Sequence, residues 1–263
     1  MLLHDHPLSP YAQKVRIMLR EKGLSFEARI PDGLGTGEVG AYSSLNPRLE
    51  VPALTVDGRT LFDSTIILDF IEEQYPDPRM MPDDPFQRAE IREIEEICDT
   101  LYEAINWGLG EIRFFGRAKD KADQLRRAGG EEIAAIHAWL EGRLSSEGWL
   151  SGGAYGRADI AALPYVTMSK TLGFAPPAGS ALEAWLARML ERPAVAATNA
   201  EAEAAVVDMA QYSGVLDSGA FRRHFRDHRL EWMMRCGGVD IVAEGLAKNN
   251  IRFTDLSYFA HPA

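Results

Sequence analysis

The chain has 263 residues, 46% of them hydrophobic and 25% charged, the balance of a globular protein that can bury a substantial core. A formal net charge of −11 makes nucleic acid and anionic membrane surfaces poor partners. We find no signal peptide, no apolar run of the ~20 residues that span a membrane, and no metal-ligand spacing around Cys98 or Cys236. We therefore expect a cytoplasmic protein with no bound metal.

The first third of the chain predicts alternating strands and helices. Residues 1–6 form a short strand, Ser9 caps a helix whose first residue is Pro10, and Gly23 ends that helix. Residues 26–30 predict a second strand, before a glycine-rich loop. The order of elements begins as β-α-β.

A hairpin is the clearest β signal. Residues 53–56 and 59–62 flank Asp57-Gly58, a pair that tolerates the positive φ of a two-residue turn. Ser64 is expected to cap the following helix, which ends before Pro76. These elements extend the order to β-α-β-β-β-α.

Residues 76–85 hold four prolines and three aspartates, which indicates a linker between domains. Strand signals are absent beyond it, and helical periodicity predicts helices over 86–115, 119–147, 157–170, 182–190 and 195–208. In the tail we expect a basic helix over 219–235, a stop at Gly237-Gly238, a helix over 239–249 and an irregular end from 250 to 263.

Three blocks of sequence resemble the glutathione transferase family. The first is Ser9-Pro10-Tyr11-Ala12-Gln13-Lys14-Val15-Arg16, followed by Glu21-Lys22-Gly23. The others are Asn46-Pro47 with Val51-Pro52-Ala53-Leu54, and Leu61-Phe62-Asp63-Ser64 with Ile66-Ile67. They occur in the family's order, cover residues 1–76, and together are far more specific than any one alone.

The resemblance implies a fold and an activity. We expect an α/β thioredoxin-like glutathione-binding domain (1–76), a linker (77–85), an all-α helical domain (86–210) and a basic helical C-terminal extension (211–263). The family's cosubstrate is glutathione, whose thiolate attacks an electrophilic small molecule, often for detoxification. The resemblance further implies a homodimer.

Ser9 is the expected catalytic residue. A helix N-terminus carries partial positive charge and free N–H groups, and the Ser9 hydroxyl there can donate a hydrogen bond to a sulfur anion. Stabilising the thiolate lowers the pKa of the thiol, which is nucleophilic only when ionised. The alternative is that Ser9 only caps its helix, and the two roles are compatible.

The other glutathione-binding residues follow from the resemblance. Pro52 would be cis and would expose the backbone of Val51 to pair with the tripeptide. Ser64 suits the γ-glutamyl carboxylate, and Asp63 suits its ammonium group. The alternatives are an ordinary edge-strand proline and a simple helix cap.

Two positions depart from the family. Asp63 stands where Glu or Gln is more common, and Glu50 stands where the family often has a lysine near the glycyl carboxylate. Because Glu50 would repel that carboxylate, we expect Arg48 or Arg29 to compensate, and we include Arg48 in the glutathione site.

The electrophile is expected to bind between the domains, beside the sulfur. Family analogy points to Tyr11, Asn106, Trp107 and Phe114, and the alternative is that they are buried core residues. Because a serine occupies the position where omega-like transferases and glutaredoxins have cysteine, reduction through a protein–glutathione disulfide is disfavoured.

Two further features of the sequence are Asp159 and the charge of the C-terminal tail. Asp159, three residues after the N-cap Gly156, is expected to be structural, although half of a capping box is missing. The tail from 211 carries seven Lys or Arg and six Asp or Glu. It is expected either to pack on an acidic body or to fold over the cleft and bind an anionic substrate.

We therefore expect a glutathione transferase, with two alternatives. One is a non-enzymatic binding or regulatory protein of the same fold, suggested by Glu50 and the unusual tail. The other is a glutathione-dependent lyase or isomerase, which a product assay would distinguish.

Overall fold

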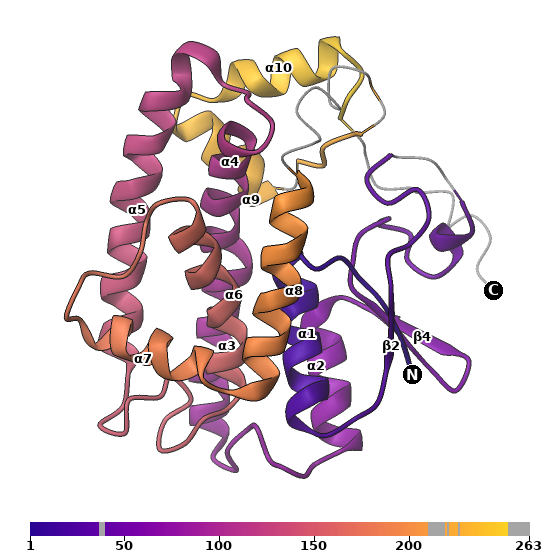
Figure 1. Ribbon diagram of the computed structural model, residues 1–263, viewed down its shortest axis with the longest axis vertical. Coiled ribbons are helices and arrows are strands. Elements are labelled where there is room, and N and C mark those ends of the chain that lie inside the picture. Colours follow the sequence, from indigo (N-terminus) through magenta and orange to yellow (C-terminus); the bar gives the residue numbers. More distant parts are fainter. Residues whose placement is uncertain (37–39, 210–218, 220, 226, 252–263) are drawn as a thin grey trace.

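The computed structural model describes residues 1–36, 40–209, 219, 221–225 and 227–251. Its two parts are a thioredoxin-like domain built on a small sheet and an all-helical domain, as expected from the sequence (Figure 1). The four strands are β1 (Leu2–His4), β2 (Glu27–Arg29), β3 (Ala53–Val56) and β4 (Arg59–Phe62). They lie in the order β2-β1-β3-β4, with β1 parallel to β2 and antiparallel to β3.

Local sequence signals predict the strands and helices of the first domain correctly, and the one exception is the cap of α2. The hairpin strands match the predicted ranges, and Asp57 and Gly58 have φ of 49° and 78°. Helix α1 (Pro10–Glu21) is capped by Ser9. Helix α2 (Ser64–Gln74) is capped by Asp63 rather than by Ser64, because Asp63 leaves the helical region with φ 76° and its carboxylate accepts the Thr65 N–H.

The helical domain contains the five predicted helical regions. The bounds are α3 (Pro85–Ile97), α4 (Glu103–Arg113), α5 (Ala122–Arg143), α6 (Arg157–Thr171), α7 (Ala181–Leu190) and α8 (Pro193–Met209), with a short 3₁₀ turn, η3 (Lys119–Lys121). Another 3₁₀ turn, η1 (Ala41–Ser44), belongs to the first domain, between β2 and β3. The helix expected over 86–115 is continuous through a π-helical segment, η2 (Cys98–Tyr102). Such segments widen a helix locally and often occur beside functional sites.

The tail is helical over a shorter range than predicted. Helix α9 (Asp227–Arg235) begins eight residues after the predicted start at 219, whereas α10 (Val239–Ala247) agrees with the prediction. Residues 221–225 are not helical because their backbone groups bind elsewhere: Arg222 N–H donates to the Gly35 carbonyl and Arg223 N–H to the Asn250 carbonyl. Most of the irregular end predicted for 250–263 lies outside the described residues.

The start of α6 shows how a missing cap is replaced. Asp159 is fully buried and accepts hydrogen bonds from the N–H groups of Gly156 and Leu150, and from Trp185 Nε1. Ser151 supplies the hydroxyl that Gly156 lacks, since its Oγ accepts the Ala158 N–H at 3.0 Å. Asp159 is therefore structural, as expected, and the second half of the capping box comes from a residue outside the helix.

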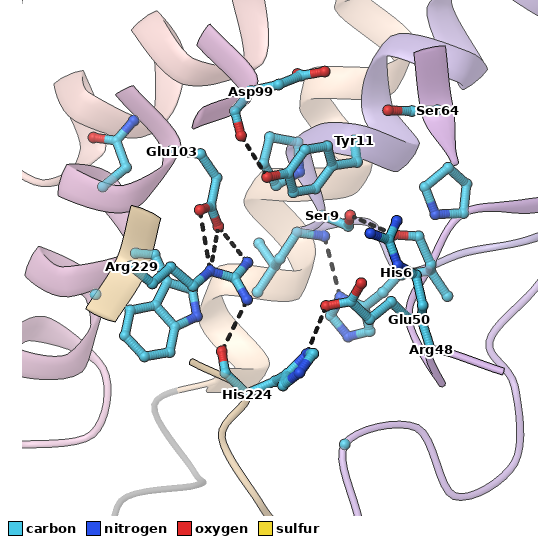
Figure 2. Close-up of a pocket in the computed structure, with 18 of the residues that line it drawn as sticks. His6, Ser9, Tyr11, Arg48, Glu50, Ser64, Asp99, Glu103, His224 and Arg229 are labelled. Atoms are coloured by element: carbon cyan, nitrogen blue, oxygen red, sulfur yellow. Dashed lines mark hydrogen bonds and ion pairs between the residues drawn. The ribbon is translucent and has the colours of Figure 1, made fainter. Parts of the chain in front are cut away.

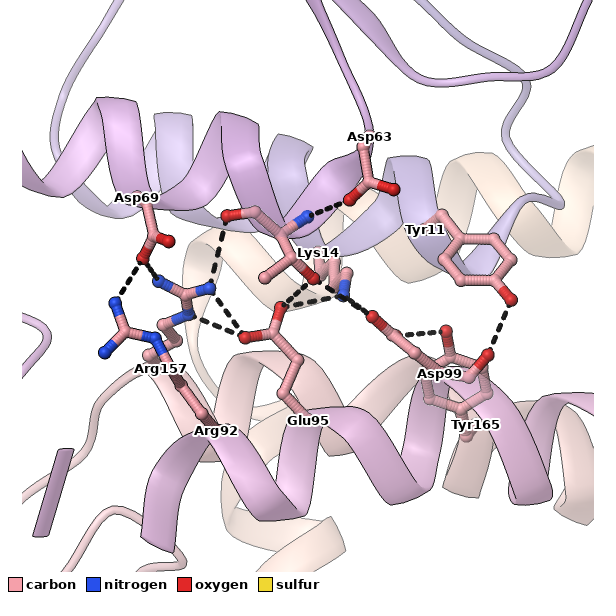
Figure 3. A network of polar contacts seen from close by, with 10 residues as sticks. Tyr11, Lys14, Asp63, Asp69, Arg92, Glu95, Asp99, Arg157 and Tyr165 are labelled. Carbon is pink, nitrogen blue, oxygen red and sulfur yellow. Dashed lines mark hydrogen bonds and ion pairs between the residues drawn. The ribbon is translucent and has the colours of Figure 1, made fainter. Parts of the chain in front are cut away.

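A buried ionic network joins the two domains (Figure 3). Lys14 of α1 is fully buried, and its Nζ lies 2.8 Å from Glu95 Oε1 and 2.5 Å from Asp99 Oδ2. Arg157 of α6 binds the second oxygen of Glu95, at 2.7 Å, and also pairs with Asp69 of α2. The network thus links α1 and α2 of the first domain to α3, η2 and α6 of the second.

Candidate functional site

A cleft of about 1240 Å³ lies between the two domains (Figure 2). Its floor is the N-terminus of α1, with the loop before β3 and the start of α2 along one side. The η2 and α4 segments form the opposite side, and residues 221–225 and 227–229 of the tail form the remaining wall. Sequence elements that are far apart therefore meet around one cavity.

Ser9 lies at the floor of this cleft, as the N-cap of α1. Its Oγ accepts the Ala12 N–H at 3.3 Å and donates weakly to the Val51 carbonyl at 3.5 Å. Both contacts are long for hydrogen bonds, so the hydroxyl can reorient toward a ligand atom at small cost. The helix N-terminus adds a positive electrostatic potential at the same point.

His6 lies beside Ser9 and is neutral. Burial, only partly offset by Asp5, lowers the pKa of His6 below its ordinary value. Its Nδ1 accepts the Leu8 N–H at 3.2 Å, which places any ring proton on Nε2. The floor of the cleft therefore carries no charged histidine near neutral pH, and its positive potential comes from the helix.

The loop before β3 exposes a backbone edge opposite Ser9. The Val51–Pro52 peptide bond is cis, as the family resemblance implied. The Glu50 carbonyl just before it accepts hydrogen bonds from Tyr42 Oη at 2.6 Å and Asn46 Nδ2 at 2.7 Å. These two bonds hold the loop in place and leave Val51 at the edge of the cleft.

Asp63 and Ser64 line the same side of the cleft. Ser64 is 3% exposed, and no hydrogen bond reaches its hydroxyl from the described part of the chain. The Asp63 carboxylate caps α2 and lies 3.2 Å from Arg48 Nη1. A ligand ammonium at Asp63 would share that carboxylate with Arg48.

The four residues expected to bind the electrophile line the cleft. Tyr11 Oη donates to the Asp99 carbonyl at 2.7 Å. Asn106 Nδ2 donates to the Tyr165 carbonyl at 2.9 Å, while its buried Oδ1 makes no hydrogen bond. Trp107 and Phe114 supply apolar surface from the α4 region. All four are therefore cleft residues, although several also pack within the domain.

Glu50 has a partner in the tail that the sequence did not indicate. His224 Nδ1 lies 3.0 Å from Glu50 Oε1, across 174 residues of sequence. The cations we had expected there form ion pairs with other acids: Arg48 with Asp63, and Arg29 with Glu27. The Glu50 carboxylate is therefore contacted from the tail, which no local sequence signal could have indicated.

Arg229, a cation of the tail, is buried in the cleft wall. Arg229 forms a two-pronged ion pair with Glu103, and His228 Nε2 lies 3.2 Å from the same carboxylate. Burial by itself would raise the pKa of Glu103, but Arg229 and His228 outweigh it and hold that pKa at about 2. The Glu103 carboxylate therefore stays ionised and in contact with the tail residues Arg229 and His228.

Two absences hold for the described residues. No group of three or more His, Cys, Asp or Glu side chains in these ranges could hold a metal ion. None of the helices described there is long and apolar enough to cross a membrane.

Comparison with known proteins gives consistent matches. The family models for the glutathione S-transferase N-terminal and C-terminal domains match residues 3–79 and 105–193. Maleylacetoacetate isomerase of Pseudomonas aeruginosa is 32% identical over 194 residues, which are 70% of this chain and 86% of that protein. The mouse protein of the same name is 37% identical over 100 residues, covering 36% of this chain and 46% of that protein.

Solved structures agree with these matches. A glutathione S-transferase from Rhodospirillum rubrum has a TM-score of 0.65 and 26% identity, covering 75% of this chain and 90% of that one. A maleyl pyruvate isomerase, described as a bacterial glutathione S-transferase in the Zeta class, has a TM-score of 0.65 and 25% identity, covering 75% and 96%. The family models end at residue 193, so the tail lies outside them.

Proposed function

We propose that this chain, which belongs to the glutathione S-transferase family, is a glutathione-dependent isomerase of an unsaturated small molecule that carries carboxylates. Family membership makes glutathione the cosubstrate. The position of Ser9 carries the proposal, because its hydroxyl faces the cleft at the N-terminus of α1. The outcome of the reaction, isomerisation, is supported by the relatives named maleylacetoacetate isomerase and maleyl pyruvate isomerase.

The chain's residues would bind and orient the tripeptide. The backbone of Val51 offers an edge for strand-like pairing, and Ser64 at the start of α2 offers a hydroxyl and an N–H to a carboxylate. Asp63 offers its carboxylate to the γ-glutamyl ammonium. Ser64 is 3% exposed and lines the cleft, so its hydroxyl lies where such a ligand would bind.

Glutathione supplies a thiolate that can add to a carbon–carbon double bond and leave again after rotation about that bond, so that it is regenerated. Ser9 Oγ–H would turn from the Val51 carbonyl to donate to the sulfur, and the N-terminus of α1 would stabilise the negative charge. Each unit by which the thiol pKa falls corresponds to about 1.4 kcal/mol. Tyr11, Asn106, Trp107 and Phe114 would form the pocket for the unsaturated substrate.

The test follows substrate and thiol together. The protein is incubated with maleylpyruvate or maleylacetoacetate and a substoichiometric amount of glutathione, and free thiol is titrated as the substrate isomerises. An isomerase converts many equivalents of substrate with no loss of thiol. Loss of one thiol for each substrate molecule would indicate a transferase instead, and no reaction with either substrate would contradict the proposal.

Ser9→Ala tests the role of the hydroxyl. We expect turnover to fall by about 10–100-fold, with the acid limb of the pH–rate profile shifted upward by about one unit, because the thiolate loses a hydrogen bond. Loss of the helix cap alone would lower stability without moving that limb. Ser44→Ala, at an exposed serine outside the cleft, is the matched control and should retain the wild-type profile.

The quaternary structure and location form a further part of the proposal. We infer a cytoplasmic homodimer that needs neither nucleic acid nor membrane. Ile66 of α2 is 54% exposed and Leu101 of η2 is 48% exposed. Thr65, which precedes Ile66, donates a hydrogen bond to Asp99, two residues before Leu101. Large apolar side chains exposed in this way favour contact with a second copy. Sedimentation equilibrium should give twice the chain mass, and Ile66→Glu should shift it toward the monomer.

A further inference from the structure

The described part of the C-terminal tail packs against both domains at two glycines. The Phe221 ring covers Gly35, where a Cβ atom would lie 1.9 Å from the ring, and Trp232 covers Gly108, where a Cβ would lie 2.2 Å from the indole. Gly35 also has φ +81°, a conformation that favours glycine. The bond from Arg222 N–H to the Gly35 carbonyl adds to this contact. These contacts hold the described part of the tail in place as one wall of the cleft.

Most charged side chains on the cleft wall already have partners. Arg229 and His228 contact Glu103, and His224 contacts Glu50. Arg223 pairs with Glu111 and lies over the Trp107 and Phe115 rings, at 4.5 and 4.8 Å from their centres. These tail side chains already contact protein acids or aromatic rings, so they have little capacity left for a ligand anion.

Arg222 differs from its neighbours. It lines the cleft, yet no acidic side chain in the described ranges forms an ion pair with its guanidinium group. Its Nε atom is buried and makes no hydrogen bond within the part of the chain that the structure describes. A guanidinium cation whose buried donor lacks an acceptor is costly, and its planar set of donors matches a carboxylate.

We propose that Arg222 binds a carboxylate of a ligand held in the cleft, so that the C-terminal tail supplies the anion-binding group of this site. This inference rests on the proposed function for its choice of ligands. The carboxylate belongs either to glutathione or to the unsaturated substrate, because both molecules carry this group. Arg222 is then a specificity-determining residue that lies outside the part of the chain matched by the family models.

Binding measurements can identify the source of the carboxylate. The variants are Arg222→Gln and Arg222→Lys, the second keeping the charge but not the planar donors. The matched control is Arg235→Ala, an arginine of the same tail that pairs with Glu132 and does not line the cleft. Calorimetry gives Kd for glutathione, for its glycyl ethyl ester, and for succinate, an unreactive dicarboxylate, added to the protein saturated with S-methylglutathione.

Two results would support the proposal. If the ligand is the glycyl carboxylate, Arg222→Gln weakens glutathione by about 10-fold or more but leaves the ethyl ester unchanged. If the ligand is the substrate, Arg222→Gln weakens succinate by a similar factor and leaves glutathione unchanged. Arg222→Lys should lie between the wild type and Arg222→Gln in whichever measurement responds.

The proposal is overturned if Arg222→Gln, with a circular dichroism spectrum like that of the wild type, binds all three ligands within twofold of the Arg235→Ala control. Should Arg222→Gln fail to fold, the comparison of Arg222→Lys with the control decides by the same criterion. Failure of the proposed function would look different: the wild type would bind these ligands normally but would not isomerise the maleyl substrates.

Discussion

Replacing Lys14 with methionine should destabilise the protein strongly. The ammonium group is fully buried between Glu95 at 2.8 Å and Asp99 at 2.5 Å. Although burial alone would lower the pKa of Lys14, Asp99 and Glu95 together hold that pKa above its ordinary value. Methionine fills a similar volume but leaves two buried carboxylates close together with one cation fewer.

The magnitude follows from the geometry. Removing one partner of a buried ion pair typically costs about 3–5 kcal/mol, because the remaining charge is left uncompensated. Arg157 still contacts Glu95, and Tyr165 Oη still donates to Asp99 at 2.7 Å, so we expect the lower half of that range. For a chain of this size the melting temperature should fall by about 6–16 °C.

The effect should depend on pH in a defined direction. In the wild type Lys14 and Arg157 outweigh burial and hold the pKa of Glu95 at about 2, below the ordinary 4.5. A lowered carboxyl pKa stabilises the fold above pH 4.5, and that contribution is lost as the pH falls through about 2. The difference between Lys14→Met and wild type should therefore be complete at pH 7 and shrink below pH 4.5.

Urea unfolding at pH 7, followed by circular dichroism, measures the free energy of unfolding. Lys170→Met, at an exposed lysine of α6, is the control and should change that free energy by no more than about 0.5 kcal/mol. The double variant Lys14→Met with Asp99→Asn should recover part of the loss, because it removes one of the two carboxylates. A loss below about 1 kcal/mol for Lys14→Met would refute the reasoning.

Three further changes test other parts of the structure. Burial lowers the pKa of His137 to about 4, so as the pH falls the unfolded chain takes up a proton before the folded chain does. The free energy of unfolding should therefore decrease as the pH falls from 6.5 to 4. In His137→Gln, urea unfolding should show a weaker dependence of this free energy on pH. Ser151→Ala removes the substitute cap of α6 and should cost about 1 kcal/mol by urea unfolding. Gly35→Ala places a Cβ against the Phe221 ring and should make the tail more sensitive to limited proteolysis.

Matched variants accompany two of these predictions. Ser146→Ala, at an exposed serine near Ser151, should leave the unfolding free energy unchanged within about 0.5 kcal/mol. A Cβ at Gly40 meets no atom within 4 Å, so Gly40→Ala should not alter proteolysis. Equal effects of Gly35→Ala and Gly40→Ala would show that the contact between Gly35 and the tail is unimportant.

Local chemistry in the sequence was enough for the first domain. The Asp57-Gly58 turn is fixed by residues that tolerate positive φ, and the strands on either side follow from its register. Ser9 and Pro10 define the start of α1 because capping depends only on neighbouring residues. The order of these elements and the three motif blocks also indicated the family.

Contacts between distant segments could not be read from the sequence. Residues 221–225 have a composition compatible with a helix, but their backbone groups bind Gly35 and Asn250, so the helix starts at Asp227. The partner of Glu50 is 174 residues away. A long-range pairing depends on how the whole chain folds back on itself, and a single sequence carries no local signal of it. The sequence thus determined which elements form and to which family the chain belongs, because both depend on local patterns, whereas the tertiary structure decided which side chains meet around the cleft.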